Sequence, residues 1–230
     1  MKVIIFAAGK GSRLQPITDT TPKPLIQINN KPILSHIIES LPDEITEIYI
    51  VGKHLIEQLH VFSKTHNLNK KITIVEQINS HTGTMAALLS VKDLFDLEKK
   101  ERFLVLNGDD LQNKKELEMY LQYPRSFGVQ HSHIPYYAIE SYNGIVKGFR
   151  KQTKEELEKG GAKIATGTYV LDTEIFKFEP IVLSDGDIGL PQTILSQKDT
   201  YPIHIVETTK WIPINSHEDL QKAKDFIENK

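Results

Sequence analysis

The sequence predicts an α/β fold in which a mostly parallel central sheet is flanked by helices and continued by a mixed β extension. Three patterns lead to this prediction. Short apolar runs alternate with segments of helical spacing, polar loops follow several of these runs, and strand-like segments with turns dominate from about residue 124. Short apolar runs are typical of strands buried on both faces, and strands separated by helices form the right-handed crossovers of parallel sheets.

The first half of the chain, about residues 1–123, contains four expected strands with helices between them. The expected strands are 3–8, 47–52, 72–77 and 102–110, and the expected helices are 33–41, 53–66 and 83–95. Three strands lead into unusual loops, which read AAGKGSR, EQINSHTGT and NGDD. Because ligands bind outside the carboxyl ends of strands in such sheets, these loops are expected to form one site.

The second half, about residues 124–230, is interpreted as a mixed β extension of the same sheet. The expected elements are strands at 127–134, 144–150, 164–171, 202–207 and 210–214, and helices at 190–197 and 217–229. Since no linker rich in Pro, Ser or Gly separates the two halves, we expect a single domain, 1–230.

Composition excludes several classes of function. The net charge of −2 argues against a nucleic-acid partner bound by charge alone, and the absence of Cys excludes disulfides and thiolate metal sites. No apolar run approaches the roughly 20 residues of a membrane-spanning helix, so we expect no membrane insertion. A cytoplasmic protein fits these features, and a homo-oligomer remains possible.

The loop AAGKGSR has the residue types of a phosphate-binding loop. Gly9 and Gly11 permit positive φ and close backbone approach, so that N–H groups can converge on phosphate oxygens. Arg13 adds a planar cation, and Lys23 projects from a backbone held by a proline on each side. The dinucleotide fingerprint needs a third Gly where Leu14 stands, and the Walker loop needs Gly-Lys-Ser/Thr where this chain has Gly-Ser-Arg. A glycine-rich turn with a surface Arg13 is the simpler alternative.

The stretch AAGKGSRLQPITDTTPKPLIQINNKPIL resembles the start of the sugar-nucleotide pyrophosphorylases, which join a nucleoside triphosphate to a sugar 1-phosphate. Further similarity lies at VLNGDD, ATGTYVLD and WIPINSHEDL, so the resemblance spans nearly the whole chain. It implies a Rossmann-like nucleotidyltransferase fold, a nucleotide-binding half in 1–123 and a sugar-phosphate-binding half in 124–230. It also implies Mg²⁺ as cofactor.

The resemblance also implies roles for individual residues. Arg13 would hold the β- and γ-phosphates, Lys23 would reach the α-phosphate and the incoming phosphate, and Asp109 would bind Mg²⁺. The implied nucleotide-binding residues are Ala8, Gly9, Gly11, Ser12, Gln77, Gly83 and Thr84. The implied sugar-phosphate-binding residues are Gly144, Lys151, Gly167 and Thr168.

Two departures from the family pattern concern the acceptor and the metal. Many members carry Phe-x-Glu-Lys-Pro for the sugar, whereas this chain has Lys151 and Gln152 at those places. Many members also carry a metal-binding Asp two residues after a Trp, where this chain has Pro213. Asn215 offers a neutral oxygen as a second ligand, and Asp187 is a more distant candidate.

Three functions follow from these patterns. The leading hypothesis is a nucleotidyltransferase that uses UTP, with dTTP or GTP as other possibilities, and a sugar 1-phosphate. The first alternative is a cytidylyltransferase that acts on a non-sugar phosphate such as phosphocholine. The second alternative is a catalytically silent, nucleotide-binding regulatory protein, which the proline at 213 motivates. We expect no appended acyltransferase domain, since few residues follow the last predicted helix.

Overall fold

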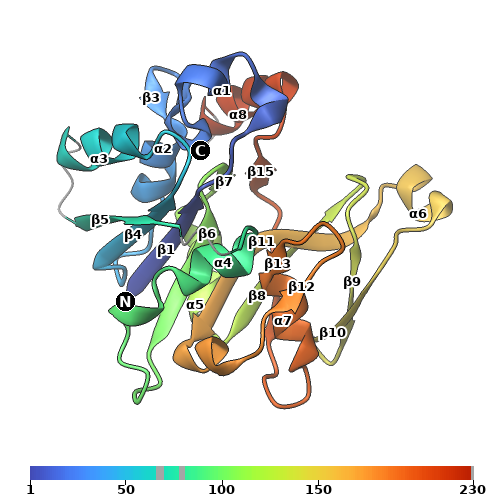
Figure 1. The fold of residues 1–230 in the computed structure, drawn as a ribbon. Helices are drawn as coiled ribbons and strands as arrows, with labels where there is room; N and C mark the ends of the chain where they lie inside the picture. Colours follow the sequence, from blue (N-terminus) through green and yellow to red (C-terminus); the bar gives the residue numbers. More distant parts are fainter. Residues whose placement is uncertain (66–69, 78–80, 229–230) are drawn as a thin grey trace.

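The computed structural model describes residues 1–65, 70–77 and 81–228 (Figure 1). The strands are β1 (Lys2–Ala7), β2 (Gln27–Ile28), β3 (Lys31–Pro32), β4 (Glu47–Gly52), β5 (Lys71–Glu76), β6 (Arg102–Asn107), β7 (Asp110–Gln112), β8 (Ser126–Ser132), β9 (Ala138–Tyr142), β10 (Ile145–Arg150), β11 (Ala162–Asp172), β12 (Ile181–Val182), β13 (Ile188–Gly189), β14 (His204–Glu207) and β15 (Trp211–Pro213).

The helices are α1 (Ile17–Thr20), α2 (Ile33–Glu39), α3 (Ile56–Thr65), α4 (Thr84–Leu89), α5 (Lys114–Leu121), α6 (Lys154–Glu158), α7 (Leu190–Ser196) and α8 (His217–Glu228). Short 3₁₀ turns are η1 (Ser12–Leu14), η2 (Lys23–Leu25), η3 (Lys92–Leu94) and η4 (Thr173–Lys177). The last residues of the helices expected at 53–66 and 217–229, and the middle of the loop EQINSHTGT, lie outside the described residues.

One sheet runs through both halves of the chain. Its strand order over the described residues is β5-β4-β1-β6-β11-β8-β14-β10-β9. The strands β5, β4, β1 and β6 are parallel, whereas β11 runs antiparallel to both β6 and β8. The α/β fold with a mixed β extension is therefore confirmed, and Figure 1 shows the extension continuing the sheet away from β1.

Each face of the sheet is buried under helices. In β1, Val3 and Ile5 belong to one apolar core and Ile4 to the other, as expected from the two-residue period of a strand. The first core contains residues of α2, α3, α5 and α8, and the second contains residues of α4 and α7. Burial on both faces explains why β1 reads as a continuous apolar run.

The strand expected at 102–110 is wrong at its carboxyl end. β6 ends at Asn107, and the N–H of Gly108 donates to the carbonyl of Phe6 at 2.8 Å where the chain turns. The next residues form β7, which pairs with β15 in a separate two-stranded ladder. The sequence VLNGDD therefore leaves the central sheet two residues before Asp109.

In the described part of the chain, no helix is both long and apolar enough to cross a membrane.

Candidate active site

A cavity of about 730 Å³ lies at the carboxyl ends of the parallel strands. The loops that follow β1, β4, β5 and β6 all contribute to its lining, as the sheet topology leads us to expect. The predicted residues that line it are Ala8, Gly9, Gly11, Ser12, Arg13, Lys23, Gln77, Gly83, Thr84, Asp109 and Asn215. Residues from the start, middle and end of the sequence thus meet at one site.

The glycine-rich loop is packed directly against Lys23. Gly11 has a φ of 64°, and a Cβ there would lie 3.1 Å from the Cβ of Lys23 and 3.0 Å from Thr18 Cγ2. The hydroxyl of Thr18 donates to the carbonyl of Gly11 at 3.0 Å. A side chain at this position would be strained by its backbone conformation and would push the loop away from Lys23.

Lys23, Asp109 and Asn215 form a polar cluster in the cavity. The ammonium of Lys23 contacts Asp109 Oδ2 and lies 3.3 Å from Asn215 Oδ1, while Arg13 Nη2 donates to the same amide oxygen at 2.8 Å. Lys23 is only 8% exposed, which is unusual for a lysine and requires a partner for its charge. Asp109 supplies that partner.

The ladder between β7 and β15 brings Asn215 to Asp109. Pro213 stands opposite Asp110 in this ladder, and the N–H of Ile214 donates to the carbonyl of Asp109 at 3.0 Å. Pro213 is therefore part of the strand pairing and does not line the cavity, whereas Asn215 does. Asn215 thus brings an oxygen atom into the cluster, although position 213 lacks the aspartate of the family pattern.

The donor set of this cluster fits a hard divalent cation. Asp109 Oδ2 and Asn215 Oδ1 converge on one positive charge, the Lys23 ammonium, and oxygen atoms are the ligands that Mg²⁺ prefers. Within residues 1–65, 70–77 and 81–228, no group of three or more His, Cys, Asp or Glu side chains could hold a metal. Since Mg²⁺ commonly takes one or two carboxylates together with phosphate and water, two protein oxygens are sufficient.

Asp110 lies behind the cluster and is buried. Asn107 Nδ2 donates to Asp110 Oδ2 at 2.9 Å. Burial raises the pKa of Asp110 well above its usual value, the neighbouring charge of Asp109 raises it further, and the bond from Asn107 opposes the shift. Gly167 packs against the Asn107 amide, which a Cβ at that position would meet at 2.1 Å. Asp109 therefore faces the cavity, while Asp110 and Gly167 support the floor formed by Asn107.

The loop that follows β5 is joined to the second half of the chain. Gly83 has a φ of 97°, and a Cβ there would lie 2.5 Å from the carbonyl oxygen of Ile188. The N–H of Ile188 donates to the carbonyl of Thr82 at 2.9 Å, and the N–H of Leu190 donates to the hydroxyl of Thr84 at 3.0 Å. Asp187, which accepts a hydrogen bond from Thr82, consequently lines the same cavity as Asp109.

Gln77 is buried at the start of this loop. Its backbone N–H donates to the carbonyl of Gly52 at 2.8 Å, and its side-chain Nε2 donates to the carbonyl of His81 at 3.4 Å. These contacts hold the side chain at the wall of the cavity.

The four predicted sugar-phosphate-binding residues do not line the cavity. Gly144 has a φ of 74° and forms the hairpin turn between β9 and β10 together with Asn143, as Asn-Gly pairs do. Lys151 is exposed after β10, and Thr168 is fully buried with its hydroxyl bonded by Gln112. Gly167 lies behind the Asn107 amide, and the role of all four residues in sugar binding stays a prediction.

The sequence analysis missed several cavity-lining residues, including Lys53 and His54. Lys53 and His54 directly follow β4, and His54 Nε2 lies 2.9 Å from the carbonyl oxygen of Thr18. The sequence could have indicated both residues, because the expected strand 47–52 is parallel to the first strand and its carboxyl end must lie at the same edge of the sheet. Lys53 adds a further cation to the site.

Comparisons with known proteins show the family to which this chain belongs. The model of a family described as nucleotidyl transferase matches residues 2–230. The bifunctional protein GlmU of Methanocaldococcus jannaschii is 36% identical over 244 residues, which cover 99% of this chain and 53% of that protein. This chain spans about half the length of the GlmU relatives that it matches.

Two solved structures share the fold. A putative glucose-1-phosphate thymidylyltransferase from Bacillus anthracis has a TM-score of 0.82 and 21% identity, covering 100% of this chain and 96% of its own. The inositol-1-phosphate CTP transferase from T. maritima has a TM-score of 0.80 and 17% identity, covering 99% of this chain and 94% of its own. At these identities the likeness concerns the fold alone.

Proposed function

We propose that this chain, which belongs to the nucleotidyl transferase family, joins a nucleoside triphosphate to a sugar 1-phosphate and releases pyrophosphate. The cluster of Lys23, Asp109 and Asn215 in the cavity is the main support for this function. A reaction between two anions requires fixed cations and oxygen ligands for a metal beside the phosphates, and this cluster lies against a glycine-rich loop.

In the proposed reaction, an oxygen of the sugar phosphate attacks the α-phosphorus of the triphosphate. A new oxygen–phosphorus bond forms, the bond from the α-phosphorus to the bridging oxygen breaks, and pyrophosphate leaves with that oxygen. Arg13 and the N–H groups of the loop from Ala8 to Ser12 would hold the β- and γ-phosphates. Lys23 would stabilise the charge on the α-phosphate.

The pairing of Lys23 with Asp109 suits this task. Before the triphosphate binds, each group neutralises the other, with 10% of the Lys23 side chain and 27% of the Asp109 side chain exposed. Phosphate oxygens would give Lys23 an alternative partner, which would release Asp109 and Asn215 to hold Mg²⁺. When bound, Mg²⁺ would neutralise charge on the phosphates.

Gln77, Gly83 and Thr84 would form the pocket for the base. The Gln77 side chain is fixed at the cavity wall, and the backbone of Gly83 packs against that of Ile188 beside it. UTP is the nucleotide that we expect, with dTTP and GTP as the next to test.

A cytidylyltransferase acting on a non-sugar phosphate such as phosphocholine is the second candidate. The observation that favours it is the exposed Lys151 and the adjacent Gln152, which stand where many family members carry an acid for the sugar. A catalytically silent regulator is less well supported, because Asn215 supplies an oxygen beside Asp109 despite Pro213.

Pyrophosphate release measured over a grid of nucleoside triphosphates and phosphorylated acceptors, with Mg²⁺, tests the proposal. We expect turnover with one sugar 1-phosphate, lost on addition of EDTA and in Asp109→Ala. Asp96→Ala is the matched control, since Asp96 bonds to the exposed Lys99 and to the N–H of Glu98 and does not line the cavity. Turnover only with CTP and an amino-alcohol phosphate would favour the second candidate. Triphosphate binding without any turnover would overturn the enzymatic proposal.

A further inference from the structure

We propose that Tyr136 is a positioning residue that fixes the orientation of the Asn215 side-chain amide. Its hydroxyl accepts from Asn215 Nδ2 at 3.4 Å, so the amide oxygen faces Lys23 and Asp109. The inference rests on the function proposed above in one respect, because it takes that oxygen as a metal ligand.

The orientation matters because the two ends of an amide differ in chemistry and hardly in shape. The oxygen accepts hydrogen bonds and binds cations, whereas the NH₂ group only donates. A half-turn of the Asn215 amide would aim two N–H bonds at the ammonium of Lys23 and at any metal beside Asp109. An aspartate, the residue of the family pattern, presents oxygen in both orientations and needs no such control.

The backbone of Asn215 is already fixed by its neighbours. Its N–H donates to Asp219 Oδ2 at 2.8 Å, and the N–H of Asp219 donates to Ser216 Oγ at 3.3 Å at the start of α8. The adjacent residue, Ile214, is bonded to Asp109 through its N–H. Only the side-chain torsions of Asn215 remain to be set.

Among the described residues, three contacts set those torsions, and one of them does not depend on the phosphate-binding cations. Arg13 and Lys23 hold the amide oxygen, but both are expected to turn to the triphosphate when it binds. The contact between Asn215 Nδ2 and Tyr136 is then the one that keeps the oxygen facing the metal position.

Tyr136 is itself held in place by Gln152. Gln152 Nε2 donates to the carbonyl of Ile134 at 2.6 Å and to the carbonyl of Tyr136 at 2.8 Å. Its Oε1 is buried and has no hydrogen-bond partner within the described part of the chain, so these two donor contacts fix its amide. Tyr136 is 40% exposed, so burial does little to fix it and the contacts from Gln152 provide the support.

The two departures of this sequence from the family pattern are thereby linked. Gln152 stands at a position where many members carry a charged residue for the sugar. Asn215 supplies an oxygen in a chain that has Pro213 in place of the metal-binding aspartate. In this structure, Gln152 holds the loop that carries Tyr136, and Tyr136 holds Asn215.

Binding of Mn²⁺ in the presence of tripolyphosphate, followed by electron paramagnetic resonance, tests the inference without requiring turnover or the correct base. We expect Tyr136→Phe to raise the Kd of Mn²⁺ about tenfold, the size typical of a lost outer contact to a metal ligand. In an Asn215→Asp background, the same substitution should change the Kd by less than about twofold, because a carboxylate has no orientation to lose. Gln152→Ala should change the Kd of Mn²⁺ in the same way as Tyr136→Phe in both backgrounds.

Equal effects of Tyr136→Phe in both backgrounds, or no effect in either, would overturn the inference. Tyr123→Phe is the matched control, since that tyrosine is similarly exposed and stacks on His204. If Asn215→Ala leaves Mn²⁺ binding unchanged, the metal role of Asn215 fails and the inference fails with it. Pyrophosphate release by the wild type would still stand in that case, so the two failures are distinguishable.

Discussion

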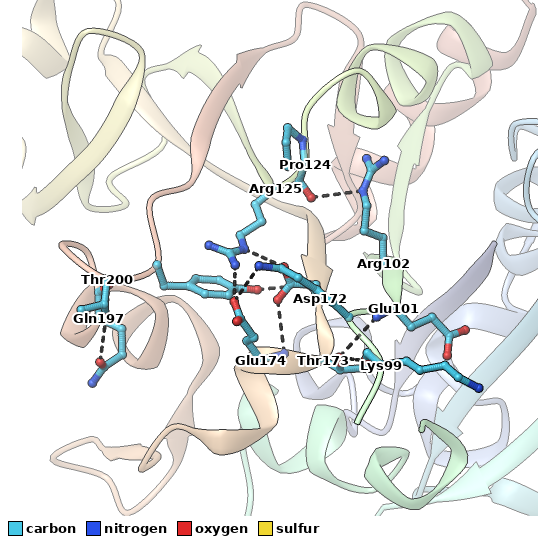
Figure 2. Close-up of polar contacts among 12 residues, drawn as sticks. Lys99, Glu101, Arg102, Pro124, Arg125, Asp172, Thr173, Glu174, Gln197 and Thr200 are labelled. Atoms are coloured by element: carbon cyan, nitrogen blue, oxygen red, sulfur yellow. Dashed lines mark hydrogen bonds and ion pairs between the residues drawn. The ribbon is translucent and has the colours of Figure 1, made fainter. Parts of the chain in front are cut away.

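Two clusters of charged side chains lie at opposite ends of β6 and are built differently. At the carboxyl end, Lys23 and Asp109 face the cavity with 10% and 27% of their side chains exposed. At the amino end, Arg125 lies between Asp172 and Glu174, and its Nε donates to Asp172 Oδ2 at 2.8 Å (Figure 2).

The cluster around Arg125 is closed. The side chain of Asp172 is only 2% exposed, and the guanidinium of Arg125 lies 3.8 Å from the ring centre of Tyr201. Lys100 adds an ion pair to Glu174 at 3.1 Å. Each charge in this group has its partners within the protein, so the group ties the end of β11 and η4 to the start of β8 without a ligand.

The cluster around Lys23 is open and has an excess of positive charge. Among the residues that line the cavity, Lys10, Arg13, Lys23 and Lys53 are cationic, while only Asp109 and Asp187 are acidic. Similar residue types can therefore either stabilise a fold or form a binding site for an anion. What distinguishes the two cases is whether the charges balance before a ligand arrives.

Lys23→Ala should produce the largest functional change. We expect the rate of pyrophosphate release to fall about 10²–10³-fold, because a fixed cation at the reacting phosphate is lost. The melting temperature should change little, since Asp109 is partly exposed and can be solvated. Lys163→Ala, which removes a surface pair with Glu207, is the control. A parallel loss of folding would contradict an open, ligand-directed cluster.

Arg125→Met should lower stability and leave activity unchanged, the opposite of the effect expected for Lys23→Ala. The free energy of unfolding should fall by about 3–5 kcal/mol, because the buried carboxylate of Asp172 loses its main partner. Activity per folded molecule should stay at the wild-type level. Urea denaturation measures the first effect, and Arg125→Met with Asp172→Asn should recover part of the loss. A fall in activity with unchanged stability would reverse the assignment of the two clusters.

Gly83→Ala should have an intermediate effect on both stability and activity. A residue with a side chain would be strained at a φ of 97°, and its Cβ would lie 2.5 Å from the carbonyl oxygen of Ile188. We expect a stability loss of about 1–3 kcal/mol and a raised KM for the triphosphate. Gly160→Ala is the matched control, because Gly160 also has positive φ but has no atom within 4 Å of an added Cβ among the described residues. Equal effects would show that only backbone strain matters.

Glu174→Gln should have the smallest effect and a characteristic pH dependence. Lys100, followed by Arg125, holds the pKa of Glu174 below its usual 4.5. A lowered folded-state pKa stabilises the protein above pH 4.5, and this contribution is lost as the pH falls through the folded-state value. Because 41% of the side chain is exposed, the substitution should cost less than about 1 kcal/mol at pH 7. Urea denaturation should show this difference shrinking below pH 4, and a constant difference would contradict it.

Local sequence patterns determined most of the fold class and half of the candidate site. The apolar runs indicated β1, β4, β5 and β6 to within a few residues. In β1, β4 and β6, burial on both faces leaves a pattern that needs no knowledge of partners. The glycines, Arg13 and Lys23 were recognisable because a phosphate loop requires specific residue types at short spacing. The helix α5 was missed, although Asn113 caps it by accepting from the N–H of Glu116.

Only the tertiary structure decided which distant segments meet. Asn215 reaches Asp109 through the ladder between β7 and β15, and Asp187 reaches the cavity through its contact with Thr82. Nothing in the local sequence around these residues specifies those partners. The place of Gly144 in the turn between β9 and β10 could not be predicted for the same reason, since a glycine that completes a hairpin and one that admits a ligand look alike in sequence. Sequence sets what each segment can become, whereas pairing and burial among segments far apart in the chain set where its side chains act.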